Sequence, residues 1–596
     1  MKTILTIVLM VLSFTVNRAQ SDSRERARMA EAYERSGDIR SAARIYQELY
    51  EAQPSNDVYY RGVVRTLIAL GQEKSLRPIV EQRLQRQPDT RTSALAARLA
   101  WKTGDTVRAE ELWRRAIDLG DGAADVYDMI AVDQRELGLY HRAIASLLRS
   151  RDIVGADDTH ARELAALYTV VGDVRRAMEE ILRYHRRARD VNNVRGLISA
   201  LMTTDESKNI VRSVLDAQPE DETLILPIRQ WFARETKDWE TALRLTILLD
   251  EARNVRGQDI LAFADGARAD GRYDIALRAY ERVRTHQQAS QGAVLSAAYG
   301  TARTLEARFR AGDRPDPDEA NTIIELYKAI VREHPNSGLS AEALLQTARL
   351  QLDPLGDRVS AIETLQRLVN GFRGTVPAAE GQLLQARIFL SNRQFEPALA
   401  AVVDLSRIRQ THITDQRDRA ELLLADILLA TGRRDSAAAM YQQLASNPGS
   451  VAANDALERS LLLSFAVDDS AGVAQFLRGF AANLTNDLTS AAGEYQKAAT
   501  LARDRELKDR SSLEAAECFV RLGNDTTAEP LLRPLTERAP ECIFGDRAYW
   551  LLADIAVRRG DIPSALQHLG NLLVNYPRSI LVSDARERIR RLRGDA

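Results

Sequence analysis

A glycine recurs at a nearly constant interval through the first third of the chain, and this period limits the possible folds more than any other feature. Gly37, Gly71, Gly104, Gly138 and Gly172 are separated by 34, 33, 34 and 34 residues. A fixed period of about 20 to 50 residues indicates structural repeats that stack on one another. The chain has 596 residues, which is more than one hydrophobic core usually organises. We therefore predict an elongated array of repeats.

The residues around the first of these glycines predict the fold of one repeat. The stretch before Gly37 contains no proline and is rich in alanine, glutamate and arginine, which favour helix. Gly37 can adopt the left-handed conformation that ends a helix, and Asp38 can cap the next one. Ala42 and Tyr46 then share one helical face, and Pro54 ends the unit. Each unit is therefore expected to be a helical hairpin whose apolar side is covered by the next hairpin.

This spacing resembles the tetratricopeptide repeat family, whose units are 34-residue helix–turn–helix hairpins. In the first unit the matching residues are Ala30, Tyr33, Gly37, Ala42, Tyr46, Leu49 and Pro54. The second unit keeps Val64, Leu67, Gly71 and Pro88, but has Leu76 where a small residue is usual. The resemblance is clearest in residues 23–191, less regular in 425–591 and weakest in 192–260. It implies an all-α fold, an α-solenoid of tandem hairpins that forms a right-handed superhelix in two halves.

One interruption of the pattern suggests where the two halves meet. Residues 311–320 contain Pro315 and Pro317 among charged side chains, a composition typical of a connector. We therefore predict an N-terminal array over residues 21–310 and a C-terminal array over residues 321–596. The charged end of the second array suits the solvent-facing helix that closes a stack of repeats.

The beginning of the chain resembles an export signal. Lys2 is followed by an apolar run over residues 3–16, which is too short for a membrane-spanning helix and suits the core of a signal peptide. We predict a signal peptide over residues 1–20, with cleavage near Ala19 or Gln20, and export to a bacterial-type periplasm or cell envelope. An uncleaved anchor is the alternative. No later stretch is apolar enough to predict a transmembrane segment in the mature chain.

The two cysteines leave one question open. An exported protein can form a disulfide, so Cys518 and Cys542 could be bridged. The alternative is that both thiols are small residues packed in the core.

The sequence contains no recognisable catalytic, cofactor or metal motif. The seven histidines form no pair four residues apart, and no phosphate-binding glycine loop or Cys-x-x-Cys is present. The Arg-Gly-Asp at 559–561 occupies the same helix-ending turn as the repeat glycines, so we interpret it as a helix stop and a cap. A net charge of −2 gives no general attraction to nucleic acid. We therefore expect no enzyme activity, cofactor, metal or nucleic-acid partner.

The resemblance also implies where a ligand would bind. In this family the ligand surface is the concave face, carried mainly by the first helix of each hairpin. The residues that match it here are Arg24, Arg61, Arg65, Arg91, Arg98, Lys102, Arg135 and Arg162. An arginine-rich groove could bind the carboxylates of a peptide or of an acidic partner. The alternative is that these arginines are ordinary solvated helix residues.

The leading functional hypothesis is a non-enzymatic scaffold of the periplasm or cell envelope that binds proteins or peptides through this face. A second hypothesis is a component of the outer-membrane or peptidoglycan assembly machinery that binds glycan or an assembly complex. It depends on residues 571–592, which resemble the closing repeat of such envelope proteins. A third hypothesis is an enzyme with its site in the irregular segment 192–330.

Overall fold

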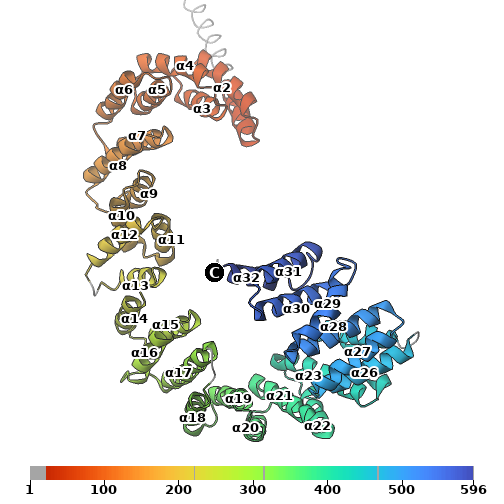
Figure 1. Ribbon diagram of the computed structural model, residues 1–596. Coiled ribbons are helices and arrows are strands. Elements are labelled where there is room, and N and C mark those ends of the chain that lie inside the picture. Colours follow the sequence, from red (N-terminus) through yellow and green to blue (C-terminus); the bar gives the residue numbers. More distant parts are fainter. Residues whose placement is uncertain (1–21, 220–221, 313–315, 466–468, 595–596) are drawn as a thin grey trace, which may run out of the picture. The chain divides into compact units, whose positions relative to one another are not determined.

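The computed structural model describes residues 22–219, 222–312, 316–465 and 469–594. Every regular element within these ranges is a helix, and consecutive helices follow one another as hairpins (Figure 1). The predicted all-α fold, an α-solenoid of tandem hairpins, is confirmed. The chain divides into two compact units, Met1–Asn254 and Val255–Ala596. The predicted signal peptide, residues 1–20, lies outside the described residues.

The first unit begins with a helix over residues 22–35. The helices that follow it are α2 (Ile39–Ala52), α3 (Asp57–Ala69), α4 (Glu73–Arg86), α5 (Thr90–Lys102), α6 (Thr106–Leu119), α7 (Ala124–Glu136), α8 (Tyr140–Val154), α9 (Ala161–Val170), α10 (Val174–Ala188), α11 (Val191–Leu201), α12 (Asp205–Asp216), α13 (Leu226–Glu235) and α14 (Trp239–Arg253).

The second unit contains the remaining helices and one short 3₁₀ turn, η1 (Thr411–Ile413). Its helices are α15 (Gln258–Ala269), α16 (Tyr273–Arg284), α17 (Gln291–Ala311), α18 (Pro317–Glu333), α19 (Gly338–Leu352), α20 (Arg358–Gly371), α21 (Val376–Ser391), α22 (Phe395–Ser406), α23 (Thr414–Ala430), α24 (Arg434–Ala445), α25 (Ala453–Ser464), α26 (Ser470–Leu484), α27 (Leu488–Leu501), α28 (Arg505–Arg521), α29 (Asp525–Thr536), α30 (Gly545–Arg558), α31 (Ile562–Asn575) and α32 (Val582–Arg593).

The turns inside the hairpins have the predicted chemistry. Gly37 has a φ of +85°, and the four glycines that continue the period also have positive φ. Asp38 then caps α2, because its carboxylate accepts a hydrogen bond of 3.1 Å from the backbone N–H of Ser41. The Arg-Gly-Asp segment is the same turn: Gly560 has a φ of +76°, and Asp561 caps α31. A side chain at these glycines would strain the backbone, which explains the regular glycine.

Three hairpins make the same turn without a glycine. Lys237, Arg393 and Asn486 have φ values of 61°, 57° and 59° at the position that the repeat glycine takes elsewhere. Asp238 and Asp487 then cap the following helices, as Asp38 does. These substitutions explain why the repeat pattern weakens in the sequence at these hairpins although the structure continues.

Neighbouring helices approach closely where an aromatic ring faces a glycine. Tyr46, Tyr280 and Tyr495 are buried. A β-carbon on the glycine that faces each ring would lie within 3.0 Å of that ring; these glycines are Gly62, Gly300 and Gly479. Only a glycine leaves room for the ring, so ring and glycine together set the spacing of the helices.

The second unit contains one irregular hairpin junction. In the regular part, each first helix packs against the first helix of the next hairpin, as α19 does against α21 and α21 against α23. After α24, the additional helix α25 packs against α24, and α23 packs directly against α26. An ion pair of 2.7 Å between Arg393 and Asp487 joins the turn after α21 to the turn after α26.

The structure also bears on the remaining sequence predictions. Residues 313–315 of the predicted connector 311–320 lie outside the described residues, and α18 begins within it at Pro317. Cys518 and Cys542 are free, buried thiols, as the core alternative proposed, and burial raises the pKa of Cys518 to about 12. No helix in the described part of the chain is long and apolar enough to span a membrane.

Candidate functional site

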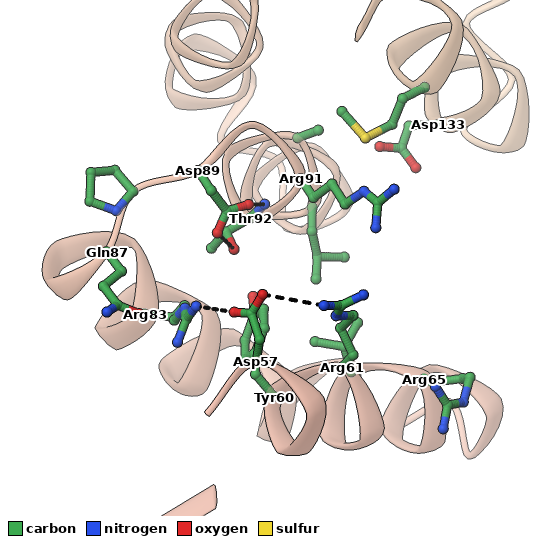
Figure 2. A pocket seen from close by; sticks show the side chains of 15 residues that line it. Asp57, Tyr60, Arg61, Arg65, Arg83, Gln87, Asp89, Arg91, Thr92 and Asp133 are labelled. Carbon is green, nitrogen blue, oxygen red and sulfur yellow. Dashed lines mark hydrogen bonds and ion pairs between the residues drawn. The ribbon is translucent and has the colours of Figure 1, made fainter. Parts of the chain in front are cut away.

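The first unit contains a cavity of about 590 Å³ that is lined by its second, third and fourth hairpins. The first helices α3, α5 and α7 form most of its wall, and α4 contributes one side chain (Figure 2). The residues that line it are Asp57, Tyr60, Arg61, Val64, Arg65, Arg83, Gln87, Pro88, Asp89, Arg91, Thr92, Ala94, Leu95, Met129 and Asp133. This volume is in the range of typical ligand sites.

Three of the arginines predicted from the sequence line this cavity, namely Arg61, Arg65 and Arg91. Arg61 and Arg65 lie one turn apart on α3, and Arg91 lies near the beginning of α5. In Figure 2 the guanidinium groups of Arg61 and Arg91 face the same open space from opposite walls. The first helices α3 and α5 therefore bring these three residues to one cavity.

A fourth arginine, Arg83, was not predicted. It comes from the second helix α4, and only 6% of its side chain is exposed. Its guanidinium pairs with Asp57, donates a hydrogen bond of 3.2 Å to the carbonyl oxygen of Pro54, and lies 5.2 Å from the centre of the Tyr60 ring. Because Asp57 also pairs with Arg61 at 3.3 Å, one carboxylate serves two guanidinium groups.

The other two arginines differ in their partners. Arg65 pairs with Glu34, with 2.6 Å between Nη2 and Oε2, and the guanidinium holds the pKa of Glu34 below its usual value. Arg91 is exposed and forms no ion pair with any described residue. It is therefore the cavity arginine most available to a ligand.

Burial shifts the pKa values of two further groups in the wall. Burial raises the pKa of Asp133 to about 6, although Arg98, at 3.3 Å, acts in the opposite direction. Burial also raises the pKa of Tyr60 to about 12, with the neighbouring Thr92 hydroxyl opposing the shift. Thr92 itself donates a hydrogen bond of 2.7 Å to Asp89, the residue that caps α5. These partners hold the wall in a defined arrangement.

The remaining predicted residues lie outside the cavity. Arg98 pairs with Asp133 and with Glu136 at 2.7 Å, and Lys102 pairs with Glu73. The other three are exposed and do not line the cavity: Arg24, Arg135 and Arg162. Of the eight predicted residues, three line the cavity and five do not.

The cavity combines guanidinium groups with apolar side chains. Guanidinium groups bind carboxylates with two parallel hydrogen bonds. Val64, Leu95 and Met129 supply an apolar wall beside them. Elsewhere in the described ranges, no group of three or more His, Cys, Asp or Glu side chains is placed to hold a metal ion.

Comparison with known proteins gives one sequence match and several structural ones. The profile of the tetratricopeptide repeat matches residues 342–374 and 419–450. No curated protein matches the chain. Both matched segments lie in the second unit, whereas the 34-residue register that predicted the fold lies in the first.

Similar solved structures cover nearly the whole chain at low identity. The match to the structure of Naa15/Naa10 bound to HypK-THB covers 96% of this chain and 96% of the matched chain, with 13% identity and a TM-score of 0.26. The APC/C hetero-tetramer Cut9–Hcn1 covers 90% and 96%, with 15% identity and a TM-score of 0.21. Yeast Tom70 covers 96% and 99%, with 10% identity and a TM-score of 0.27. TM-scores this low support no inference about shape or partners. The sequence finding is that residues 342–374 and 419–450 match the profile of the tetratricopeptide repeat.

Proposed function

We propose that this protein is a non-enzymatic scaffold that binds an acidic protein or peptide segment through the face formed by α3 and α5. The observation that carries the proposal is the 590 Å³ cavity on this face, which four arginines line. Arg61 and Arg83 share one carboxylate, and Arg91 has none among the described residues. The guanidinium groups of this face can therefore bind a carboxylate of the ligand.

The apolar part of the wall narrows the class of ligand that the cavity would bind. Val64, Leu95 and Met129 lie next to the arginines in the same cavity. A peptide with an acidic residue beside an apolar one would satisfy both parts of the lining. The cavity is open to solvent and is lined by three successive first helices, which suits an extended segment of chain.

The location we propose is the periplasm or cell envelope, after removal of residues 1–20. The signal-like beginning of the sequence supports it. Export with the protein's own leader can be followed by fractionation. Recovery of the mature chain only from the cytosol would contradict this part of the proposal.

A second candidate function is a component of outer-membrane or peptidoglycan assembly. The resemblance of residues 571–592 to the closing repeat of such proteins supports it. In the structure this segment includes α32, whose Ala585 is fully buried in the terminal core. Sedimentation of the mature chain with isolated peptidoglycan and with outer membranes tests this candidate. A negative result with both would remove it.

Reversing the charge of three cavity arginines is expected to abolish most partner capture. The variant Arg61→Glu/Arg65→Glu/Arg91→Glu replaces three carboxylate-binding groups with carboxylates. Charge-assisted hydrogen bonds are the strong ones, so we expect at least about tenfold less partner captured. The measurement is crosslinking and pull-down with the mature chain from its own envelope fraction, quantified against the unchanged chain.

The matched control is Arg40→Glu/Arg44→Glu/Arg114→Glu, which makes the same charge change on exposed arginines of α2 and α6. This control should capture the partner at the normal level, and both variants should keep the helical circular dichroism spectrum. Equal capture by all three proteins would show that the α3–α5 face is not the binding surface.

A further inference from the structure

A second cavity, of about 540 Å³, lies at the irregular junction of the second unit. It exists because α23 packs directly against α26 while α25 remains outside the row of first helices. Six helices or their ends contribute to its wall. The residues that line it are Leu352, Arg358, Arg387, Ile388, Leu390, Ser391, Leu423, Asp426, Arg459, Phe480, Asn483, Leu484 and Asn486.

Most polar groups of this wall are hydrogen-bond donors, and several are cationic. Arg387 of α21 is exposed and forms no ion pair with any described residue. Arg358, the first residue of α20, donates only to the side-chain oxygen of Asn392, at 3.3 Å. Arg459 of α25 lies 5.3 Å from the centre of the Phe480 ring. A guanidinium group has five donors and no acceptor, so these side chains leave many donors free.

Two asparagines also line the cavity. Arg521 of α28 donates to the side-chain oxygens of Asn483 and Asn486, at 3.1 and 2.9 Å. The side chain of Asn483 also forms a hydrogen bond with the buried Tyr495 hydroxyl, so Asn486 is the asparagine whose NH₂ group remains for a ligand. The guanidinium of Arg521 also adds positive charge directly behind the wall.

The one carboxylate in the wall is already neutralised. Asp426 accepts a hydrogen bond of 2.6 Å from the Tyr441 hydroxyl and lies 3.5 Å from Arg459. Its side chain is largely buried, with 12% exposed. The nearest acidic group in the adjoining turn, Asp487, pairs with Arg393 at 2.7 Å. The cavity therefore presents an excess of positive charge.

We propose that this cavity binds an anionic group, a carboxylate or a phosphate, that carries an apolar substituent. The donors of Arg358, Arg387 and Asn486 would surround the anion. The apolar part would contact the hydrophobic residues of the wall, which are Leu352, Ile388, Leu390, Leu423, Phe480 and Leu484. This site is independent of the α3–α5 face, because all of its residues belong to the second unit.

The test is isothermal titration calorimetry of the mature full-length chain with four probes below their micelle concentrations. Octanoate and octyl phosphate are the two anionic probes, octylammonium reverses the charge, and inorganic phosphate lacks the apolar part. We expect at least one of the octyl anions to bind at one site per chain, and the tighter of the two identifies the preferred anion. The cation and inorganic phosphate should bind at least about tenfold more weakly.

Two variants test whether binding occurs in this cavity. Arg358→Glu/Arg387→Glu should weaken the octyl anion at least about tenfold, since it removes two exposed cations and adds two anions. Asn483→Asp/Asn486→Asp keeps the side-chain shape and should weaken it similarly. The control Arg367→Glu changes an exposed arginine of α20 outside the cavity and should have no effect.

The proposal would be overturned by no binding of either octyl anion, equal binding of octylammonium, equal binding of inorganic phosphate, or unchanged affinity in both cavity variants. Loss of octyl-anion binding in Arg61→Glu/Arg65→Glu/Arg91→Glu would place the anion at the α3–α5 face instead. Normal partner capture by Arg358→Glu/Arg387→Glu keeps this test separate from that of the proposed scaffold function.

Discussion

Replacing Arg151 with leucine is expected to destabilise the repeats of the first unit by about 3–5 kcal/mol, the cost of removing one partner of a buried ion pair. Arg151 of α8 binds Glu180 of α10 with two parallel hydrogen bonds of 2.8 and 2.6 Å. Only 3% of the Glu180 side chain is exposed. Without Arg151, this carboxylate loses its bidentate partner in a poorly hydrated environment.

The substitution of Arg151 also removes a hydrogen bond to the backbone. Arg151 also donates a hydrogen bond of 2.8 Å from Nε to the carbonyl oxygen of Thr159, in the loop before α9. Arg183, at 2.5 Å from Glu180, remains as a partner, but its side chain is 40% exposed and its interaction is correspondingly screened. We therefore expect α8, α9 and α10 to lose stability together.

The measurement is amide hydrogen exchange, because a repeat array need not unfold in one step. Protection in α8 and α10 should fall strongly in Arg151→Leu. It should recover substantially in Arg151→Leu/Glu180→Leu, where no buried charge is left alone.

The matched control is Arg187→Leu, which breaks the exposed pair with Asp158 at 2.9 Å. An exposed ion pair contributes about 0–1 kcal/mol, so this variant should exchange almost as the unchanged chain does. Equal loss of protection in Arg151→Leu and Arg187→Leu would mean that the buried Arg151–Glu180 pair contributes no more to stability than the exposed pair.

Replacing Gly300 with alanine is expected to destabilise the second unit by about 2 kcal/mol, although alanine is the better helix former. A β-carbon on Gly300 would lie within 3.0 Å of the Cε1, Cζ and hydroxyl oxygen of Tyr280. The ring cannot easily move away, because Tyr280 is fully buried and its hydroxyl donates a hydrogen bond of 2.6 Å to Asp265. The helices α16 and α17 must therefore separate.

The control for this prediction is Gly493→Ala in α27. A β-carbon there meets no atom within 4 Å, so alanine should be neutral or slightly stabilising, by up to about 1 kcal/mol. Thermal unfolding followed by circular dichroism compares the two variants. If the melting temperature of Gly300→Ala were equal to or above that of the unchanged chain, the claim that the Tyr280 ring leaves no room for a β-carbon would be wrong.

The local rules of the hairpin could be predicted from the sequence because each depends on neighbouring residues. Gly37 and Asp38 determine the turn by their own backbone and side-chain chemistry, and the structure has both as expected. The hairpins with Lys237, Arg393 or Asn486 were harder to identify, because these residues adopt the glycine conformation without being glycine. At these three turns the surrounding packing outweighs the preference of non-glycine residues for negative φ.

The candidate site could be predicted only in part. Arg61, Arg65 and Arg91 could be predicted because the period assigns all three to first helices, on which the resemblance places the ligand surface. Arg83 comes from a second helix, and its place in the cavity depends on how α4 packs across the turn at Pro54. The basic residue near the end of α4, opposite the Asp57 at the beginning of α3, is the signal that could have indicated it.

The second cavity could not be predicted at all. It depends on α25 leaving the row of first helices, so that α23 meets α26. A repeat pattern assumes that each hairpin follows the last in the same way, and it cannot show where one does not. Arg387 and Asn483 are 96 residues apart in the chain and share a wall only because of this junction.

Hydrogen–deuterium exchange of the mature chain, alone and with the partner captured from its envelope fraction, tests the central claim most directly. The scaffold account predicts that the partner slows exchange in α3 and α5, at residues 57–69 and 90–102. The peptides of the second helices α2 and α6, which contribute no residue to the cavity, should be unchanged. Slower exchange in α2 and α6 with none in α3 and α5 would contradict the account.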